Sequence, residues 1–192
     1  MKCALALAAL MATVVVWPTS SFAVDNKTFK MVASSNSCVP GASARVTVST
    51  LGDIQTLHVE ATGLPKKTTF TLFVIQVPQA PFGLAWYQGD IDTDSNGVGV
   101  GNFTGIFSIE TFIVAPGVAP APKVFPQDAT SNPATDPVQL YHLGMWFDSP
   151  DDAADAGCPS TVTPFNGDHQ AGVQVLNTSN FGQRNGPLRD IQ

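Results

Sequence analysis

The stretch from Ala44 to Thr62 reads ARVTVSTLGDIQTLHVEAT, and its hydrophobic pattern decides the fold. Residues 44–50 and 54–62 each alternate apolar and polar side chains, on either side of the turn signal Leu51-Gly52-Asp53. This alternation is typical of half-buried β-strands, because successive side chains on a strand point to opposite faces. In the second run, the polar face carries Thr56, His58 and Glu60.

Segments of similar pattern continue along the chain, separated by turn signals such as Gly63-Leu64-Pro65 and Asn96-Gly97. They are rich in Val, Thr, Phe and Gly, and we predict strands at residues 70–77, 84–91, 98–103, 106–114, 138–147 and 172–176. About eight strands at such spacing predict an all-β fold, a single immunoglobulin-like antiparallel β-sandwich.

One short helix is predicted after Ser149. This serine is a good N-cap, Pro150 suits the first helical position, and the aspartates at 151 and 152 favour the positive end of the helix dipole. Gly157 ends the helix directly before Cys158. Between the strands, residues 115–137 hold six prolines and show no periodicity, so we predict a long proline-rich loop there.

Residues 1–23 have the composition of an export signal. Lys2 is followed by an apolar run of 13 residues, and small residues at positions 21 and 23 suit cleavage before Val24. A membrane span needs roughly 20 apolar residues, so this run predicts a removable signal peptide and no transmembrane segment. We therefore divide the chain into a signal peptide (1–23), a β-sandwich domain (24–182) and a polar C-terminal tail (183–192).

The charge and the cysteine content limit which partners the protein can bind and which compartment it occupies. Cleavage removes one lysine and leaves 8 basic against 15 acidic residues, a net charge of −7, which repels nucleic acid and anionic lipid. It also removes Cys3 and leaves Cys38 and Cys158. An even pair of cysteines in an exported chain predicts a disulfide; two buried free thiols are the alternative.

Residues 61–74, ATGLPKKTTFTLFV, resemble the strand–turn–strand segment of fibronectin type III domains, where a Gly-Leu-x-Pro-like turn precedes a Thr-x-Tyr strand. The segment departs from that family at Phe70, where the family has a tyrosine. The longer run 57–147, which includes PFGLAWYQGD at residues 81–90, is similar to a group of uncharacterised secreted bacterial proteins. This resemblance implies export and a sandwich fold, and it carries no activity over to this chain.

Residues 90–97, DIDTDSNG, match the first half of an EF-hand loop. Such a loop supplies oxygen ligands from alternate positions and a bidentate glutamate at position twelve, which is Phe103 here. Asn96-Gly97 is also a strong hairpin signal. Two interpretations stay open: a plain hairpin, or a calcium site formed by Asp90, Asp92, Asp94 and Asn96.

Two other groups of residues are candidates for binding. Exposed aromatic side chains on a sheet can stack on sugar rings or anchor a partner protein, and the candidates are Trp86, Tyr87, Tyr141 and Trp146. Core packing is the alternative for all four. His58 and Glu60 share one strand face, where they form either a metal or proton-transfer pair or simply a solvated polar surface.

No Gly-x-Ser-x-Gly nucleophile motif is present in the sequence. We therefore expect a secreted, non-catalytic binding or structural protein of the cell envelope or extracellular space, with an unidentified protein or carbohydrate ligand and no cofactor other than calcium. A secreted polysaccharide-active hydrolase and a calcium-stabilised surface module are the alternatives.

Overall fold

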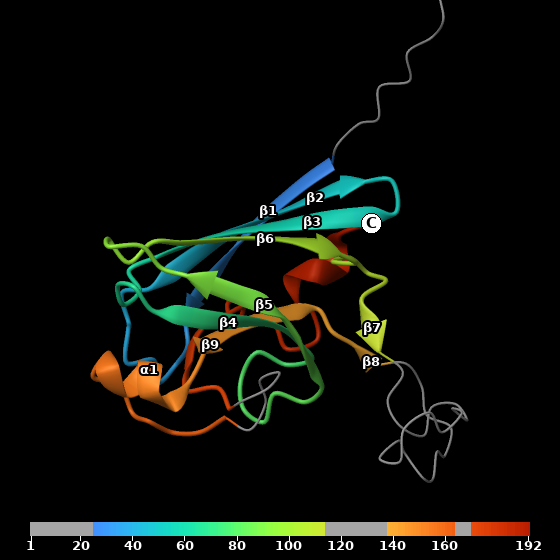
Figure 1. The fold of residues 1–192 in the computed structure, drawn as a ribbon. Coiled ribbons are helices and arrows are strands. Elements are labelled where there is room, and N and C mark those ends of the chain that lie inside the picture. Colours follow the sequence, from blue (N-terminus) through green and yellow to red (C-terminus); the bar gives the residue numbers. More distant parts are fainter. Residues whose placement is uncertain (1–24, 114–137, 164–169) are drawn as a thin grey trace, which may run out of the picture.

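The computed structural model describes residues 25–113, 138–163 and 170–192 (Figure 1). The predicted signal peptide, the predicted proline-rich loop and His169 lie outside these residues. The described residues form an all-β, antiparallel fold, as the sequence predicts.

Eight strands are hydrogen-bonded into one sheet in the order β5-β4-β9-β10-β1-β2-β3-β6. Their bounds are β1 (Asp25–Ala33), β2 (Ser43–Leu51), β3 (Ile54–Thr62), β4 (Thr69–Ile75), β5 (Ala85–Asp92), β6 (Gly99–Gly105), β9 (His142–Phe147) and β10 (Gln174–Asn177). A separate two-stranded ladder joins β7 (Phe112–Ile113) to β8 (Val138–Gln139). The described residues also form helix α1 (Pro150–Asp155) and the 3-10 turn η1 (Pro187–Asp190).

The sheet is rolled so that β1, β2, β3 and β6 face β4, β5 and β9 across the core (Figure 1). The two halves join where β1 meets β10, through the register pairs Val32–Asn177 and Ala33–Leu176. At the other end, the edge strands β5 and β6 meet in an isolated bridge between Thr93 and Gly99. The fold is therefore nearly a barrel rather than two clearly separate sheets.

The core lies between the two halves and follows the predicted alternation. Val46 and Val48 of β2 and Leu57 and Val59 of β3 are fully buried, while their neighbours face outward. β4 and β9 are buried on both faces. Their outer faces are covered by a second cluster, in which Trp146 packs edge-on against Phe73 and Phe82 at centroid distances of 5.4 and 4.9 Å.

Some segments differ from the sequence prediction. β1 was not predicted, yet it alternates in its second half, where Phe29 and Met31 enter the core. Residues 106–114 were predicted as one strand, but residues 108–111 turn instead, with the Thr111 side chain bonded to the Ser108 amide. The hydroxyl of Thr111 also bonds the Ile106 carbonyl, so local side-chain hydrogen bonds replace a strand ladder here.

The C-terminal segment 183–192, predicted as a polar tail, is part of the domain. Leu188 is fully buried and Ile191 is 4% exposed, and both belong to the main core cluster. The Ile109 amide donates to the Ile191 carbonyl at 2.8 Å. The apolar residues of this segment are too few to show a period, which is why its sequence looks like a tail.

Helix α1 has the predicted caps. The Ser149 hydroxyl accepts from the Asp152 amide at 3.1 Å, and Gly157 adopts φ +76° after the last turn. The amide of Cys158 then donates back to the Ala153 carbonyl at 2.8 Å. This Schellman-type ending places Cys158 against Cys38, and the predicted disulfide is present, with Cα atoms 5.6 Å apart.

Removing the disulfide with Cys38→Ala/Cys158→Ala should lower the free energy of unfolding by about 2–5 kcal/mol, because the bond closes a loop of 120 residues. Urea denaturation of the wild type and the double variant measures this difference. Adding reductant should bring the wild type to the variant's midpoint and leave the variant unchanged. Equal midpoints without reductant would show that the bond does not stabilise the fold.

The ring of Phe103 fills the space beside the two edge strands. A Cβ at Gly89 of β5 would lie 2.6 Å from this ring, and one at Gly101 of β6 would lie 2.7 Å from it. Gly89 also has φ +150°, a region that side chains with a Cβ rarely adopt. The two glycines thus leave room for one aromatic ring beside the edge strands β5 and β6.

Gly89→Ala should destabilise the protein by roughly 2–3 kcal/mol through backbone strain and the clash with the ring. Gly52→Ala is the control, because Gly52 also has positive φ but a Cβ at that position would meet no neighbouring atom within 4 Å. Thermal or urea unfolding should show the larger loss at Gly89, and adding Phe103→Ala should make the Gly89 substitution less costly. Equal losses at the two glycines would contradict the role of the ring.

Candidate functional site

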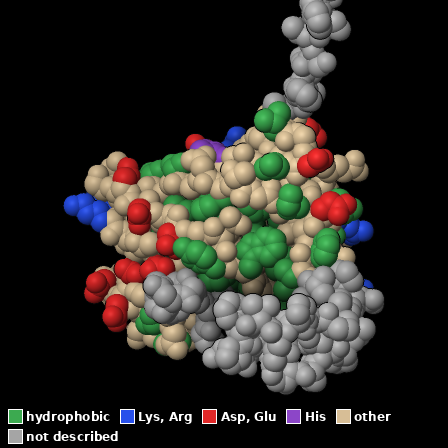
Figure 2. All heavy atoms as spheres, turned by 45° about the vertical axis from the view of Figure 1, so that its right-hand side comes forward, with side chains coloured by type: hydrophobic (Ala, Val, Ile, Leu, Met, Phe, Trp, Pro, Cys, Tyr) green, Lys and Arg blue, Asp and Glu red, His purple; other side chains and the backbone are tan. Residues whose placement is uncertain are grey.

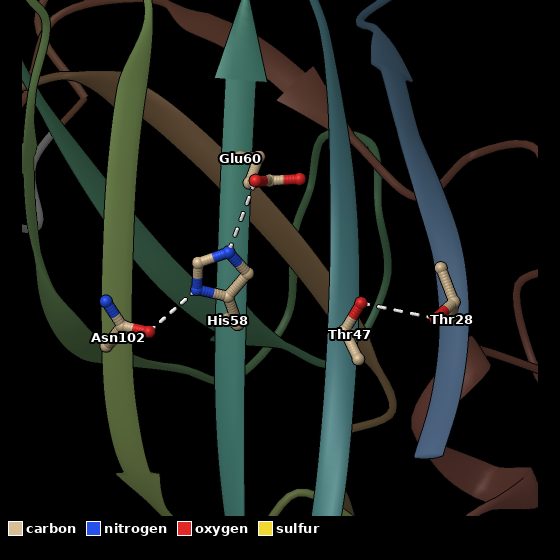
Figure 3. Close-up of polar contacts among 5 residues, drawn as sticks. All are labelled: Thr28, Thr47, His58, Glu60 and Asn102. Atoms are coloured by element: carbon tan, nitrogen blue, oxygen red, sulfur yellow. Dashed lines mark hydrogen bonds and ion pairs between the residues drawn. The ribbon is translucent and has the colours of Figure 1, made fainter.

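The outer face of β1, β2, β3 and β6, which we call the polar face, consists of outward side chains in register. One row crosses all four strands, with Asn102 opposite His58, His58 opposite Thr47, and Thr47 opposite Thr28. Figure 3 shows these side chains standing on the same side of the sheet. Unlike the outer face of β4 and β9, this face is not covered by an aromatic cluster among the described residues.

His58 is held by both of its ring nitrogens (Figure 3). Nδ1 lies 2.7 Å from Oδ1 of Asn102, and Nε2 lies 3.5 Å from Oε1 of Glu60. Nδ1 donates to the Asn102 oxygen when it carries a proton, and Nε2 pairs with the Glu60 carboxylate only when it is protonated as well. His58 and Glu60, which the sequence places on one strand face, are therefore a real contact, and Asn102 is the partner that sequence reasoning missed.

The next row along the strands is charged. Lys30 of β1 stands opposite Arg45 of β2, which in turn stands opposite Glu60 of β3. These three residues, with Ser43, Ala44 and Thr62, line a shallow hollow of about 200 Å³. In Figure 2 the upper edge of the molecule carries histidine, acidic and basic side chains next to one another. The hollow offers two cations, one carboxylate and two hydroxyls to a polar ligand.

The residues of the proposed calcium loop lie along one hairpin. The Asp92 carboxylate accepts from Thr69 at 2.7 Å, and Asp90 accepts from Tyr87 at 2.9 Å. Asp94 accepts from the amides of Val98 and Asn96, and these two hydrogen bonds are the main reason that its pKa is lowered. The oxygens thus contact protein donors along the hairpin, and the described residues contain no cluster of three or more metal-ligating side chains.

The four candidate aromatic residues do not form one surface. Trp146 is fully buried, whereas Tyr87 is 45% exposed. Trp86 is partly buried against the core and donates through its indole to Gln88 at 3.1 Å. Tyr141, on the loop before β9, donates its hydroxyl to the Ile109 carbonyl at 3.0 Å, and burial raises its pKa.

Other exposed hydrophobic residues gather near the β2–β3 turn and after β6. The largest exposed fractions are those of Leu51 and Ile54, at 61% and 54%, and Ile106 and Ile109 are also exposed. In Figure 2 the hydrophobic side chains on this side stand as separate spots among polar and acidic groups. At the centre of the same view, other hydrophobic side chains lie together in a larger group.

A second polar centre, inside the protein, was not predicted. His142 is fully buried; its Nε2 donates to the Gln183 carbonyl at 3.1 Å, and its Nδ1 accepts from the Thr178 hydroxyl at 2.8 Å. Both nitrogens are therefore satisfied in the neutral ring. Burial lowers the pKa of His142. Its partners, Thr178 and Gln183, are more than 30 residues away in the chain, so the sequence pattern does not indicate this buried site.

His142 should make the protein less stable in acid. Its folded-state pKa lies below the ordinary value of 6.5, so below pH 6.5 the unfolded chain binds more protons than the folded chain. The free energy of unfolding should therefore decrease as the pH is lowered through that window, by at most about 1.4 kcal/mol per pH unit. Urea denaturation at pH 7.5 and 5.5 measures the fall.

His142→Gln should reduce this pH dependence, because the glutamine side chain does not titrate. An unchanged slope in the His142 variant would show that another group causes the acid sensitivity.

Comparison with known proteins identified no relative of this chain. No protein-family model matches the chain, and neither does any of the curated proteins with which it was compared. Within the described residues, no helix is both long and apolar enough to cross a membrane.

Proposed function

We propose that the protein is a secreted, non-catalytic binding protein of the cell envelope or extracellular space, and that the polar face binds its ligand. The observation that carries this proposal is an outer face on four adjacent strands that no other described segment covers, with a charged hollow within it. The disulfide between Cys38 and Cys158 supports an oxidising compartment.

The geometry of this face suits an extended polar ligand. Neighbouring strands lie about 4.8 Å apart, and outward residues on one strand repeat about every 7 Å, so the rows present hydrogen-bonding groups at regular intervals. His58 is hydrogen-bonded to Asn102 at 2.7 Å, and Thr28 and Thr47 share a hydrogen bond of 3.2 Å across the strands. Such preorganised side chains lose little conformational entropy when a ligand binds. A polysaccharide chain lying across the strands fits this arrangement.

Thr47→Tyr tests the proposal, because it places a bulky ring at the centre of the polar face. Tyrosine is well accepted in strands, so we expect the fold to persist. The wild type should be retained on at least one member of a panel of insoluble polysaccharides (cellulose, chitin and cross-linked polygalacturonate), and Thr47→Tyr should lose that retention by about tenfold or more. Pull-down with quantified depletion of the free protein is the measurement.

Thr161→Tyr is the matched control, since Thr161 is an exposed threonine outside the polar face. It should bind like the wild type. Equal loss in both variants, or retention that Thr47→Tyr does not affect, would place binding elsewhere on the molecule.

A further inference from the structure

The geometry points to a carboxylate-bearing polysaccharide, a polyuronate, as the ligand of the hollow formed by Lys30, Arg45 and Glu60. This inference rests on the proposed function and specifies the class of ligand that the polar face takes.

Among the described residues, neither cation of the hollow has an acidic partner within ion-pair distance. Lys30 and Arg45 are exposed and stand directly opposite each other on neighbouring strands, an arrangement in which like charges repel. Between described residues, the structure has one ion pair, His58–Glu60, so neither cation has a carboxylate within 4 Å. A local positive site thus stands on a chain whose net charge is −6.

These two groups match a carboxylate. The guanidinium of Arg45 can donate two parallel hydrogen bonds to the two oxygens of one carboxylate, and the ammonium of Lys30 adds a point charge beside it. A ligand carboxylate placed between them would relieve the repulsion between the cations. Charge complementarity therefore favours an acidic ligand at this end of the hollow.

The opposite wall limits how much negative charge the ligand can carry. Glu60 lines the same hollow and contacts His58, so its carboxylate repels a densely charged group such as a phosphate chain. Glu60 instead accepts hydrogen bonds from hydroxyl groups, and Ser43 and Thr62 can both donate and accept. One carboxylate with several neighbouring hydroxyls is the chemistry of a uronic acid unit.

The neighbouring row extends the site beyond one sugar unit. Asn102, His58, Thr47 and Thr28 lie two residues further along their strands, at a spacing of about 7 Å from the charged row. These four groups are hydrogen-bond donors and acceptors, which suit the hydroxyls of a sugar chain. Val100, opposite Glu60 in the charged row, is an exposed aliphatic side chain beside them. The hydrogen-bonding groups of both rows favour a polyuronate over an acidic peptide, and a peptide probe tests that choice.

Isothermal titration calorimetry with soluble polygalacturonate oligomers tests the inference on the wild-type protein. Binding should weaken as salt is raised and should be lost with the fully methyl-esterified oligomers, which keep the same backbone without the charge. Lys30→Gln/Arg45→Gln should bind about 10- to 100-fold more weakly. Both side chains are exposed, so the thermal midpoint of this variant should stay close to that of the wild type.

Lys66→Gln/Lys67→Gln is the control, because it removes two exposed cations outside the polar face. It should bind polygalacturonate like the wild type. Equal weakening in both double variants, or equal binding of the esterified oligomers, would overturn the inference. Polyglutamate is the peptide probe, and binding as tight as that of polygalacturonate would also overturn it.

The same titrations separate this inference from the proposed function. If neutral oligosaccharides of cellulose or chitin bind in a manner that Thr47→Tyr abolishes, while polygalacturonate does not bind, the polar face is a binding site but the ligand is not acidic. If Thr47→Tyr leaves polygalacturonate binding unchanged, both the inference and the proposed site are wrong.

Discussion

The shared core between the two halves of the sheet is the constraint on which the rest of the structure depends. β1, β2, β3 and β6 each bury one face against this core, so their alternate side chains must point outward. β4 and β9 bury both faces, because an aromatic cluster around Trp146 covers their outer side. The other described residues thus leave one broad sheet face uncovered, and the polar rows are a consequence of this asymmetry.

Local patterns were enough to predict much of the fold. The alternation at residues 44–50 and 54–62 gave strands within one residue of β2 and β3, and the capping residues around α1 gave the helix and its end. The disulfide was predicted from cysteine number and export signal alone. β1 was missed because its exposed first half is polar and holds no core residue to establish a period.

The candidate site was only partly predictable. Sequence spacing places His58 and Glu60 on the same face of one strand, since residues two apart on a strand point the same way. That Asn102, Arg45 and Lys30 join them depends on the register between strands, which the sequence does not state. The same limit applies to Trp146: its burial comes from Phe82, a loop residue that folds over the outer face of β9.

The pairing of β1 with β10 also imposes an order on folding. β1 can pair with β2 as soon as both have been synthesised, because they are close in the chain. Its other edge pairs with residues 176 and 177, which come much later in the chain. Cys38 likewise forms its disulfide with Cys158, 120 residues later. Such long-range contacts form slowly, since a large loop must close before they stabilise anything. The residues up to Asn177 must therefore all be present before the barrel can close, and its apolar strands stay exposed until then.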